Sequence, residues 1–203
     1  MNDLHFDELA VRFAEKIYGS NKGAIRLAVL QTDIKESVPA HQLSILDIGA
    51  GLGHMALWLA QQGHTVTLVE PSTPMLQQAQ LNFQAAGYKA EFIHSDWQHF
   101  LAQAEQRYDL ILCHAVLEWL ANPLELTQAL RNHLNSDGWL SLAFYNKDAL
   151  ILQNLIKGNL RKLKKQHFSG DQGGLTPQQP LDPTLFATQL QQQGWSIKKR
   201  SGI

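Results

Sequence analysis

The sequence has a single cysteine among its 203 residues, so no internal disulfide can form and a disulfide-stapled secreted fold is excluded. That cysteine, Cys113, lies in an apolar run, which indicates a core position. Apolar runs long enough to cross a membrane are missing, and the first residues lack the basic-then-apolar pattern of a signal peptide. These absences predict a cytoplasmic protein with no membrane partner.

Metal-binding motifs are missing as well. Nine histidines occur, but no H-E-x-x-H or C-x-x-C pair accompanies them, so we expect no metal site. The sequence has no internal repeat. With 44% hydrophobic and 17% charged residues, the composition is that of an ordinary globular protein. The length predicts one domain over residues 1–203.

The glycine-rich segment 45–53 is one glycine short of a dinucleotide fingerprint. It reads D-x-G-x-G-x-G from Asp47, and the third glycine of G-x-G-x-x-G would fall at His54. No G-K-[ST] follows, so the segment is not a P-loop either. Glycines at alternate positions allow a sharp turn and the close approach of a ligand, between a strand and a helix N-terminus. A nucleotide-like cofactor is predicted there, although a tight turn without a ligand has the same pattern.

Glu70 ends the next apolar segment, residues 65–70, and lies 17 residues after Gly53. A carboxylate at this place can accept hydrogen bonds from both hydroxyl groups of a ribose. Together with the missing third glycine, Glu70 favours S-adenosylmethionine (SAM) over NAD as the cofactor. A surface acid at a strand end is the alternative interpretation of Glu70.

Strand and helix patterns alternate along the chain, which predicts an α/β fold with a Rossmann-like, doubly wound and mostly parallel sheet. The expected strands span residues 44–48, 65–70, 91–94, 108–113 and 139–145, with helices over 54–62, 73–86, 98–106 and 123–134 and a turn at 135–138. Two N-terminal helices, 6–17 and 24–36, are expected on either side of a hinge at 20–23. After residue 146 we expect a helix over 148–156, an inserted basic loop up to about residue 180, a helix over 183–193 and the start of a strand at 195–199. The domain is thus divided into a helical lid (1–40), a cofactor-binding core (41–146) and a basic C-terminal part (147–203).

Charge is distributed unevenly between these parts. Residues 1–146 hold 8 Lys and Arg against 15 Asp and Glu, a net charge of −7. Residues 147–203 hold 9 basic and 3 acidic residues, a net charge of +6, with basic runs at 157–165 and 198–200. Such asymmetry is typical of proteins that bind nucleic acid, although a solvated helix face also carries charge runs.

Four segments make the chain resemble the class I SAM-dependent methyltransferases, and more narrowly the tRNA 5-carboxymethoxyuridine methyltransferases. They are I-Y-G-x-x-K-G-x-x-R (17–26), L-D-x-G-x-G-x-G (46–53), H-A-V-L-E-W with Pro123 (114–123) and L-S-L-x-F-Y-N (140–146). The glycine motif is typical of the whole superfamily, and the other three are more specific. The family usually has glycine where Ala50 stands and aspartate where Glu70 stands, and both changes are chemically mild. Family members continue into a last strand, so we expect this chain to be truncated relative to them.

The resemblance implies an enzyme that methylates the carboxylate of 5-carboxymethoxyuridine at the tRNA wobble position, with SAM as the methyl donor and the methyl ester as the product. The implied partner is tRNA, contacted at its anticodon region. Because a carboxylate with a pKa of roughly 4 is ionised at neutral pH, the reaction needs no general base. We therefore name no catalytic acid or base.

The resemblance also implies which residues contact the cofactor: Arg26, Gly49, Ala50, Gly51, Glu70, Trp97, Gln98 and His114. Arg26 would bind the carboxylate of SAM through a forked pair of bonds, and Ala50 and Gly51 would offer backbone N–H groups. Trp97 and Gln98 would contact the adenosine, and His114 would face the crevice. A solvated Arg26, and core positions for Trp97 and His114, are the alternatives.

Asp47 is expected to orient the glycine loop through hydrogen bonds. Glu118-Trp119 and Tyr145-Asn146 are expected near the substrate base. Two other functions stay open at this point. One is methylation of a small carboxylic acid or quinone-like metabolite, which would leave the basic run without a role. The other is a non-catalytic module that binds SAM or RNA.

Overall fold

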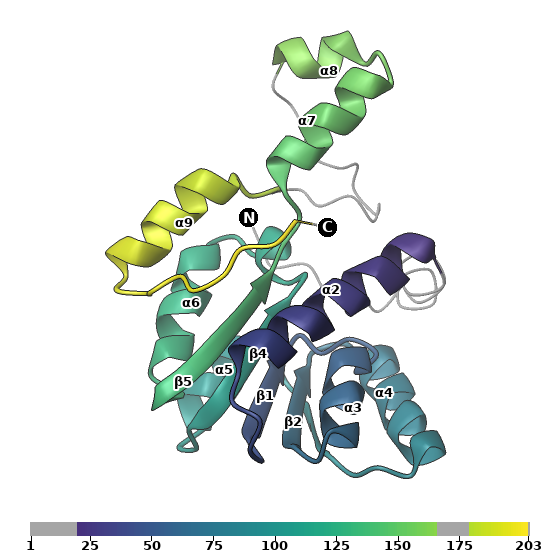
Figure 1. Cartoon of the computed structure of the whole chain (residues 1–203), viewed down its shortest axis with the longest axis vertical. Helices are drawn as coiled ribbons and strands as arrows, with labels where there is room; N and C mark the ends of the chain where they lie inside the picture. Colours follow the sequence, from purple (N-terminus) through teal and green to yellow (C-terminus); the bar gives the residue numbers. More distant parts are fainter. Residues whose placement is uncertain (1–19, 166–178, 203) are drawn as a thin grey trace.

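The computed structural model describes residues 20–165 and 179–202 of the chain (Figure 1). Within these residues one parallel sheet has the strand order β3-β2-β1-β4-β5. The strands are β1 (Ser44–Ile48), β2 (Thr65–Glu70), β3 (Glu91–His94), β4 (Tyr108–His114) and β5 (Leu134–Ala143). The predicted doubly wound α/β sheet is confirmed, and the bounds of β1, β2 and β3 are those predicted.

Helices cover both faces of the sheet (Figure 1). One face carries α2 (Asn21–Ser37), α3 (His54–Gln61) and α4 (Thr73–Ala86), and the other carries α5 (Trp97–Gln103), the short η3 (Leu117–Trp119), α6 (Pro123–Arg131) and α9 (Pro183–Gln192). Successive residues of β1 point to opposite faces, so Ile45 joins the first core and Leu46 the second. Burial on both faces explains why β1 and β4 are almost continuously apolar.

The direction in which successive strands are added to the sheet reverses at β1. The chain runs outward from β1 to β2 and β3, then returns to place β4 on the other side of β1. In parallel sheets of this kind, the crevice between the two central strands opens at their carboxyl ends. The carboxyl edge of the sheet, between the ends of β1 and β4, is therefore where a ligand is expected.

A helical arm, α7 (Lys147–Ile156) and α8 (Leu160–Lys165), follows β5. Figure 1 shows this arm projecting away from the carboxyl edge of the sheet. The prediction of a loop over the basic run was wrong for the part that forms α8. Several apolar side chains of the arm are exposed: Leu152, Leu155, Ile156 and Leu160.

Three further predictions were wrong. The expected hinge at 20–23 is the start of α2, because the Ser20 hydroxyl accepts the Gly23 N–H and caps the helix. The expected turn at 135–138 lies inside β5, where the register with β4 shifts between Tyr108 and Leu110. Residues 195–199 form no strand, and Lys199 instead pairs with α2. The helix expected over 6–17 lies outside the described residues. Among the residues that the structure describes, none of the helices could span a membrane.

Candidate functional site

The carboxyl edge of the sheet gathers all eight residues predicted to contact the cofactor. Trp97 and Gln98 begin α5 after β3, Glu70 ends β2, residues 49–51 follow β1, and His114 ends β4. Arg26 reaches the same edge from α2, where its charge acts on His54, His114 and Glu118. This shared location follows from the parallel strands, whose carboxyl ends all meet at one edge. The binding roles of these residues stay a prediction.

The glycine loop between β1 and α3 has three glycines with positive φ, at Gly49 (+66°), Gly51 (+57°) and Gly53 (+71°). A Cβ on Gly49 would lie 2.5 Å from the side chain of Val116, and one on Gly53 would lie 3.0 Å from Leu68, so both are needed for packing. A Cβ on Gly51 would meet nothing within 4 Å. Gly51 therefore borders open space that a ligand can approach closely.

The N–H groups of Ala50 and Gly51 are engaged within the protein. Ala50 donates to the Val69 carbonyl at 3.2 Å, and Gly51 donates to Glu70 Oε2 at 2.8 Å. In this conformation the two amides are therefore not the open donors that we expected. What the loop offers a ligand is space at Gly51.

Glu70 joins the loops after β1 and β2. Its carboxylate is 5% exposed, and its Oε1 accepts the Ser72 N–H at 2.9 Å while Oε2 accepts from Gly51. A carboxylate oxygen can accept more than one hydrogen bond, and a ribose hydroxyl is a donor of the kind it accepts. The predicted ribose contact is compatible with this geometry.

Asp47 lies one strand away, at 5% exposure. Burial raises its pKa to about 8, and the negative charge of Glu70 adds to the rise. No hydrogen bond joins its carboxylate to another residue in the described ranges 20–165 and 179–202. The expectation that Asp47 orients the loop by hydrogen bonding therefore finds no support there. Its carboxyl is instead mainly protonated at neutral pH.

His114 is fixed at the end of β4 by a 2.9 Å hydrogen bond between its Nε2 and the Ser141 hydroxyl. Burial lowers the pKa of His114 to about 3, assisted by the charge of Arg26, so the imidazole is neutral at physiological pH. The next residue, Ala115, has φ +59°, which costs an alanine roughly 1–3 kcal/mol. Backbone strain thus lies beside the predicted cofactor contact.

Glu118 lies in η3 and is buried, with 3% of its surface exposed. Its Oε1 accepts the Tyr145 N–H at 3.1 Å. Burial raises the pKa of Glu118 to about 7, against the opposing effects of backbone hydrogen bonds and of Arg26. The sequence indicated Glu118 as a residue near the substrate, but its burial and its support of Tyr145 come from the fold.

Buried polar atoms without a hydrogen-bond partner concentrate at this edge. Of six such side-chain atoms in the described part of the chain, four lie at or just after the carboxyl ends of β2, β3 and β4: Ser72 Oγ, Trp97 Nε1, His114 Nδ1 and Glu118 Oε2. Each orphaned atom costs roughly 1–3 kcal/mol, so a ligand that supplies the missing partners gains binding energy. Ser72 was missed by the sequence reasoning, and its place directly after the Glu70 strand was the available signal.

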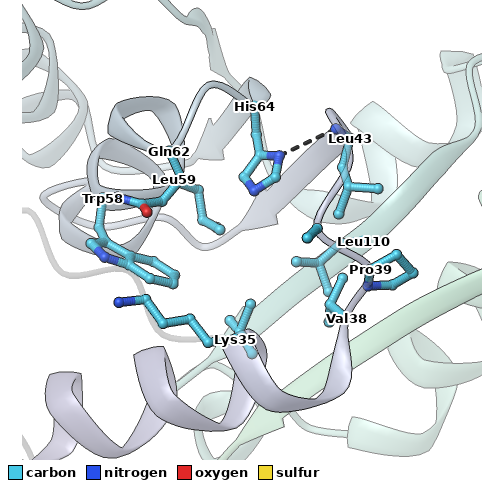
Figure 2. A pocket seen from close by; sticks show the side chains of 11 residues that line it. Lys35, Val38, Pro39, Leu43, Trp58, Leu59, Gln62, His64 and Leu110 are labelled. Atoms are coloured by element: carbon cyan, nitrogen blue, oxygen red, sulfur yellow. Dashed lines mark hydrogen bonds between the residues drawn. The ribbon is translucent and has the colours of Figure 1, made fainter.

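A separate hollow of about 180 Å³ lies at the opposite, amino edge of the sheet. Figure 2 shows Lys35 and Trp58 on one side of it and His64, bonded to the Leu43 N–H at 3.2 Å, on the other. Most of its lining residues are of apolar type, and they include none of the eight predicted cofactor contacts. This hollow is thus separate from the candidate site.

The sequence matches the family described as "Methyltransferase domain" over residues 11–199. It is 36% identical to the tRNA 5-carboxymethoxyuridine methyltransferase of Escherichia coli O157:H7, over 100% of this chain and 80% of the relative. The malonyl-[acyl-carrier protein] O-methyltransferase of Halalkalibacterium halodurans is 28% identical over 72% of this chain and 55% of its own length.

Among solved structures, the magnesium protoporphyrin IX methyltransferase of Synechocystis PCC 6803, with bound S-adenosylhomocysteine (SAH), has a similar fold. Its TM-score is 0.64 at 22% identity, over 96% of this chain and 87% of that one.

Proposed function

The chain belongs to the methyltransferase-domain family, and within it to the group of the tRNA 5-carboxymethoxyuridine methyltransferases, and on this basis we propose that it methylates the wobble carboxylate of tRNA. The substrate is 5-carboxymethoxyuridine in the anticodon region, the methyl donor is SAM, and the product is the methyl ester. The observation that carries this proposal is the 36% identity over the whole chain. No catalytic acid, base or metal takes part.

The carboxyl edge of the sheet fits SAM. Open space at Gly51 admits a bulky ligand next to the Glu70 carboxylate, which would hold the ribose. Trp97 and His114 each present a buried ring nitrogen without a partner among the described residues. Arg26 would hold the methionine carboxylate, and Trp97 and Gln98 would hold the adenosine. When bound, SAM supplies a methyl group already activated by its sulfonium.

The protein's own residues then have to position the substrate and exclude water. A carboxylate nucleophile is ionised at neutral pH, so no proton has to be removed from it. Positioning of two reactants can account for roughly 7–11 kcal/mol of a barrier. The helical lid predicted over residues 1–40, of which α2 is the described part, would contribute to this exclusion.

The helical arm supports a tRNA substrate. It begins at Lys147, just after the carboxyl end of β5, so the arm starts at the mouth of the candidate site. Its exposed basic residues include Lys157, Arg161 and Lys164, and cationic side chains of this kind bind phosphates. From the proposed tRNA substrate we infer a cytoplasmic location, and the single cysteine agrees with this inference.

The direct test is incubation of the protein with SAM and a tRNA that carries unmethylated 5-carboxymethoxyuridine. We expect mass spectrometry of the digested nucleosides to show a mass gain of one methylene on this nucleoside, and none on a matched tRNA with unmodified uridine at the wobble position. A carboxylate that stays unmethylated with active SAM present would refute the proposal.

A second function, methylation of a small carboxylic acid or quinone-like metabolite, uses the same cofactor site. The 28% identity to a malonyl-[acyl-carrier protein] O-methyltransferase favours it as the alternative. It gives the basic arm no role. Methylation of malonyl-acyl carrier protein, tested beside the tRNA, would separate the two functions.

A further inference from the structure

Two motifs far apart in the sequence meet at the carboxyl edge of the sheet. Lys22 lies in the first turn of α2, and Tyr145 follows the end of β5. The Lys22 ammonium lies over the Tyr145 ring, 5.2 Å from its centroid. At this distance the ring attracts and orients the cation. The sequence placed Lys22 in a hinge and gave it no function.

Tyr145 is held firmly in place. Its N–H donates to Glu118 Oε1 at 3.1 Å, and its carbonyl accepts the Leu181 N–H, also at 3.1 Å. Burial, with an added effect of Glu118, raises the pKa of the Tyr145 phenol, so the ring stays uncharged at neutral pH. Tyr145 is thus a fixed, neutral platform beneath the Lys22 ammonium.

The positive charge of Lys22 is not neutralised by any acid in the described ranges 20–165 and 179–202. The ion pairs found within these ranges join Lys199 to Asp33 and Glu36. Burial raises the pKa of Glu118, which accepts the Tyr145 N–H, to about 7, so its carboxyl is partly protonated at neutral pH. Lys22 is exposed to solvent, so an incoming anion can reach it.

We propose that Lys22, oriented by the Tyr145 ring, binds the carboxylate of the substrate. This inference rests on the proposed function. With Arg26 assigned to the cofactor, Lys22 provides a separate positive charge for the second carboxylate of the reaction. One substrate oxygen bonds to the ammonium, and the other forms the new bond to the methyl carbon. The carbon–sulfur bond breaks, its electron pair stays on sulfur, and no proton moves.

The test compares the affinities of SAH-loaded protein for two tRNAs of the same sequence. One carries 5-carboxymethoxyuridine at the wobble position, and the other carries unmodified uridine. We expect the wild type to prefer the carboxylate-bearing tRNA by about tenfold, since one charge-assisted hydrogen bond is at stake. The Lys22→Gln variant should lose this preference and keep its affinity for the unmodified tRNA, whereas Lys22→Arg should keep the preference.

Lys147 is the matched control, because it carries the same charge at the same edge but does not contact the Tyr145 ring. Lys147→Gln should leave the preference at its wild-type value. Tyr145 acts as a positioning residue, so Tyr145→Phe should keep the preference and Tyr145→Leu should reduce it. A merely structural role of Lys22 would weaken binding of both tRNAs equally.

The outcomes separate the two proposals. A Lys22→Gln variant that keeps the full preference, while the wild type methylates the carboxylate-bearing tRNA, would overturn this inference alone. An equal loss in Lys147→Gln would overturn the assignment to Lys22. A wild type that fails to methylate this tRNA would overturn the proposed function, and the inference with it.

Discussion

Asp109, at the amino edge of the sheet, and Asp47, at the carboxyl edge, are held in opposite ways. At the amino edge, Asp109 accepts hydrogen bonds from the Ser44 N–H at 2.8 Å, the Ser44 hydroxyl at 2.9 Å and the Asn135 amide at 2.6 Å. The Ser44 N–H in particular holds the pKa of Asp109 below its usual value. At the carboxyl edge, burial raises the pKa of Asp47 to about 8 and that of Glu118 to about 7.

The difference in pKa indicates that Asp109 contributes to the stability of the fold, whereas Asp47 lies at the edge suited to a ligand. Hydrogen bonds that favour a charged carboxylate stabilise the folded state, and Asp109 accepts three of them whereas Asp47 accepts none within the described residues. A buried carboxyl without such bonds lowers the stability of the folded state whenever it ionises. Orphaned polar atoms and the strained Ala115 lie at the carboxyl edge as well. A ligand that pairs with these atoms would therefore stabilise this edge.

The strongest contrast is between two glycines with positive φ, Gly51 at the carboxyl edge and Gly63 at the amino edge. A Cβ at either would meet nothing within 4 Å, so valine should cost each a similar backbone strain of roughly 1–2 kcal/mol. Only Gly51→Val fills the cofactor space. We expect it to weaken SAM binding by about 100-fold, measured by calorimetry, because crowding of about 3 kcal/mol has that effect.

Gly63→Val is the control, and its SAM affinity should equal that of the wild type. Equal affinities for SAM in both variants would show that the space at Gly51 does not receive the cofactor.

The second contrast is in the pH dependence of stability. Asp109 has a folded pKa below its unfolded value of roughly 3.9, so its contribution is present above that pH and is lost as the pH falls through the folded pKa. Asp109→Ala should lower the free energy of unfolding at pH 7 by about 1–2 kcal/mol, with SAM binding unchanged. Urea unfolding measures the first quantity and calorimetry the second.

Asp47 should show the opposite slope. Its folded pKa of about 8 lies above the unfolded value, so the folded state binds the extra proton and stability falls as the pH rises from roughly 4 to 8. Asp47→Asn should remove this fall, and its stability relative to the wild type should therefore increase across that window. A variant with the same slope as the wild type would contradict the raised pKa.

The third contrast concerns basic residues. Neutralising Lys162, Lys164 and Lys165 in α8 should weaken tRNA binding roughly tenfold at low salt and reduce the slope of log K against log salt. Lys89, exposed before β3 at the amino edge, is the matched control. Lys89→Gln should change neither the affinity nor the slope. Equal salt slopes for the triple variant and the wild type would exclude the arm from the tRNA interface.

The smallest expected effect is a release of protons on SAM binding. The positive charge of SAM should lower the pKa of Asp47 and Glu118, so a fraction of a proton should leave at pH 7. Calorimetry in buffers of different ionisation enthalpy measures this number. SAH, which has no sulfonium charge, should release less. Asp47→Asn should reduce the release and Asp109→Asn should not.

Much of the core was predictable because local signals agree with the tertiary structure. The helix predicted over 73–86 is α4, with Pro74 in its first turn and Gly87 at its C-cap. The location of the predicted site residues at one edge was predictable too, since parallel strands bring their carboxyl ends together.

What could not be predicted depends on contacts between distant residues. Asn135 resembles a turn residue, but its amide bonds to Asp109 across the sheet and the strand continues past it. The segment with Ser20 and Lys22 has the sequence pattern of a hinge. In the structure the Ser20 hydroxyl caps α2, and the Lys22 ammonium lies over the Tyr145 ring. The burial of Glu118 and the orphaned Ser72 hydroxyl likewise emerge only when the strands are assembled.

The contact between Lys199 and α2 bears on the order in which the protein can be completed during translation. Lys199 bonds to Glu36 at 2.5 Å and to Asp33 at 2.8 Å, and the first pair is 163 residues apart in sequence. During translation α2 leaves the ribosome long before Lys199, which forms ion pairs with it. Contacts between distant residues form late in folding. The helix α2 can therefore make its contacts with Tyr145 and Lys199 only after the five strands have been synthesised.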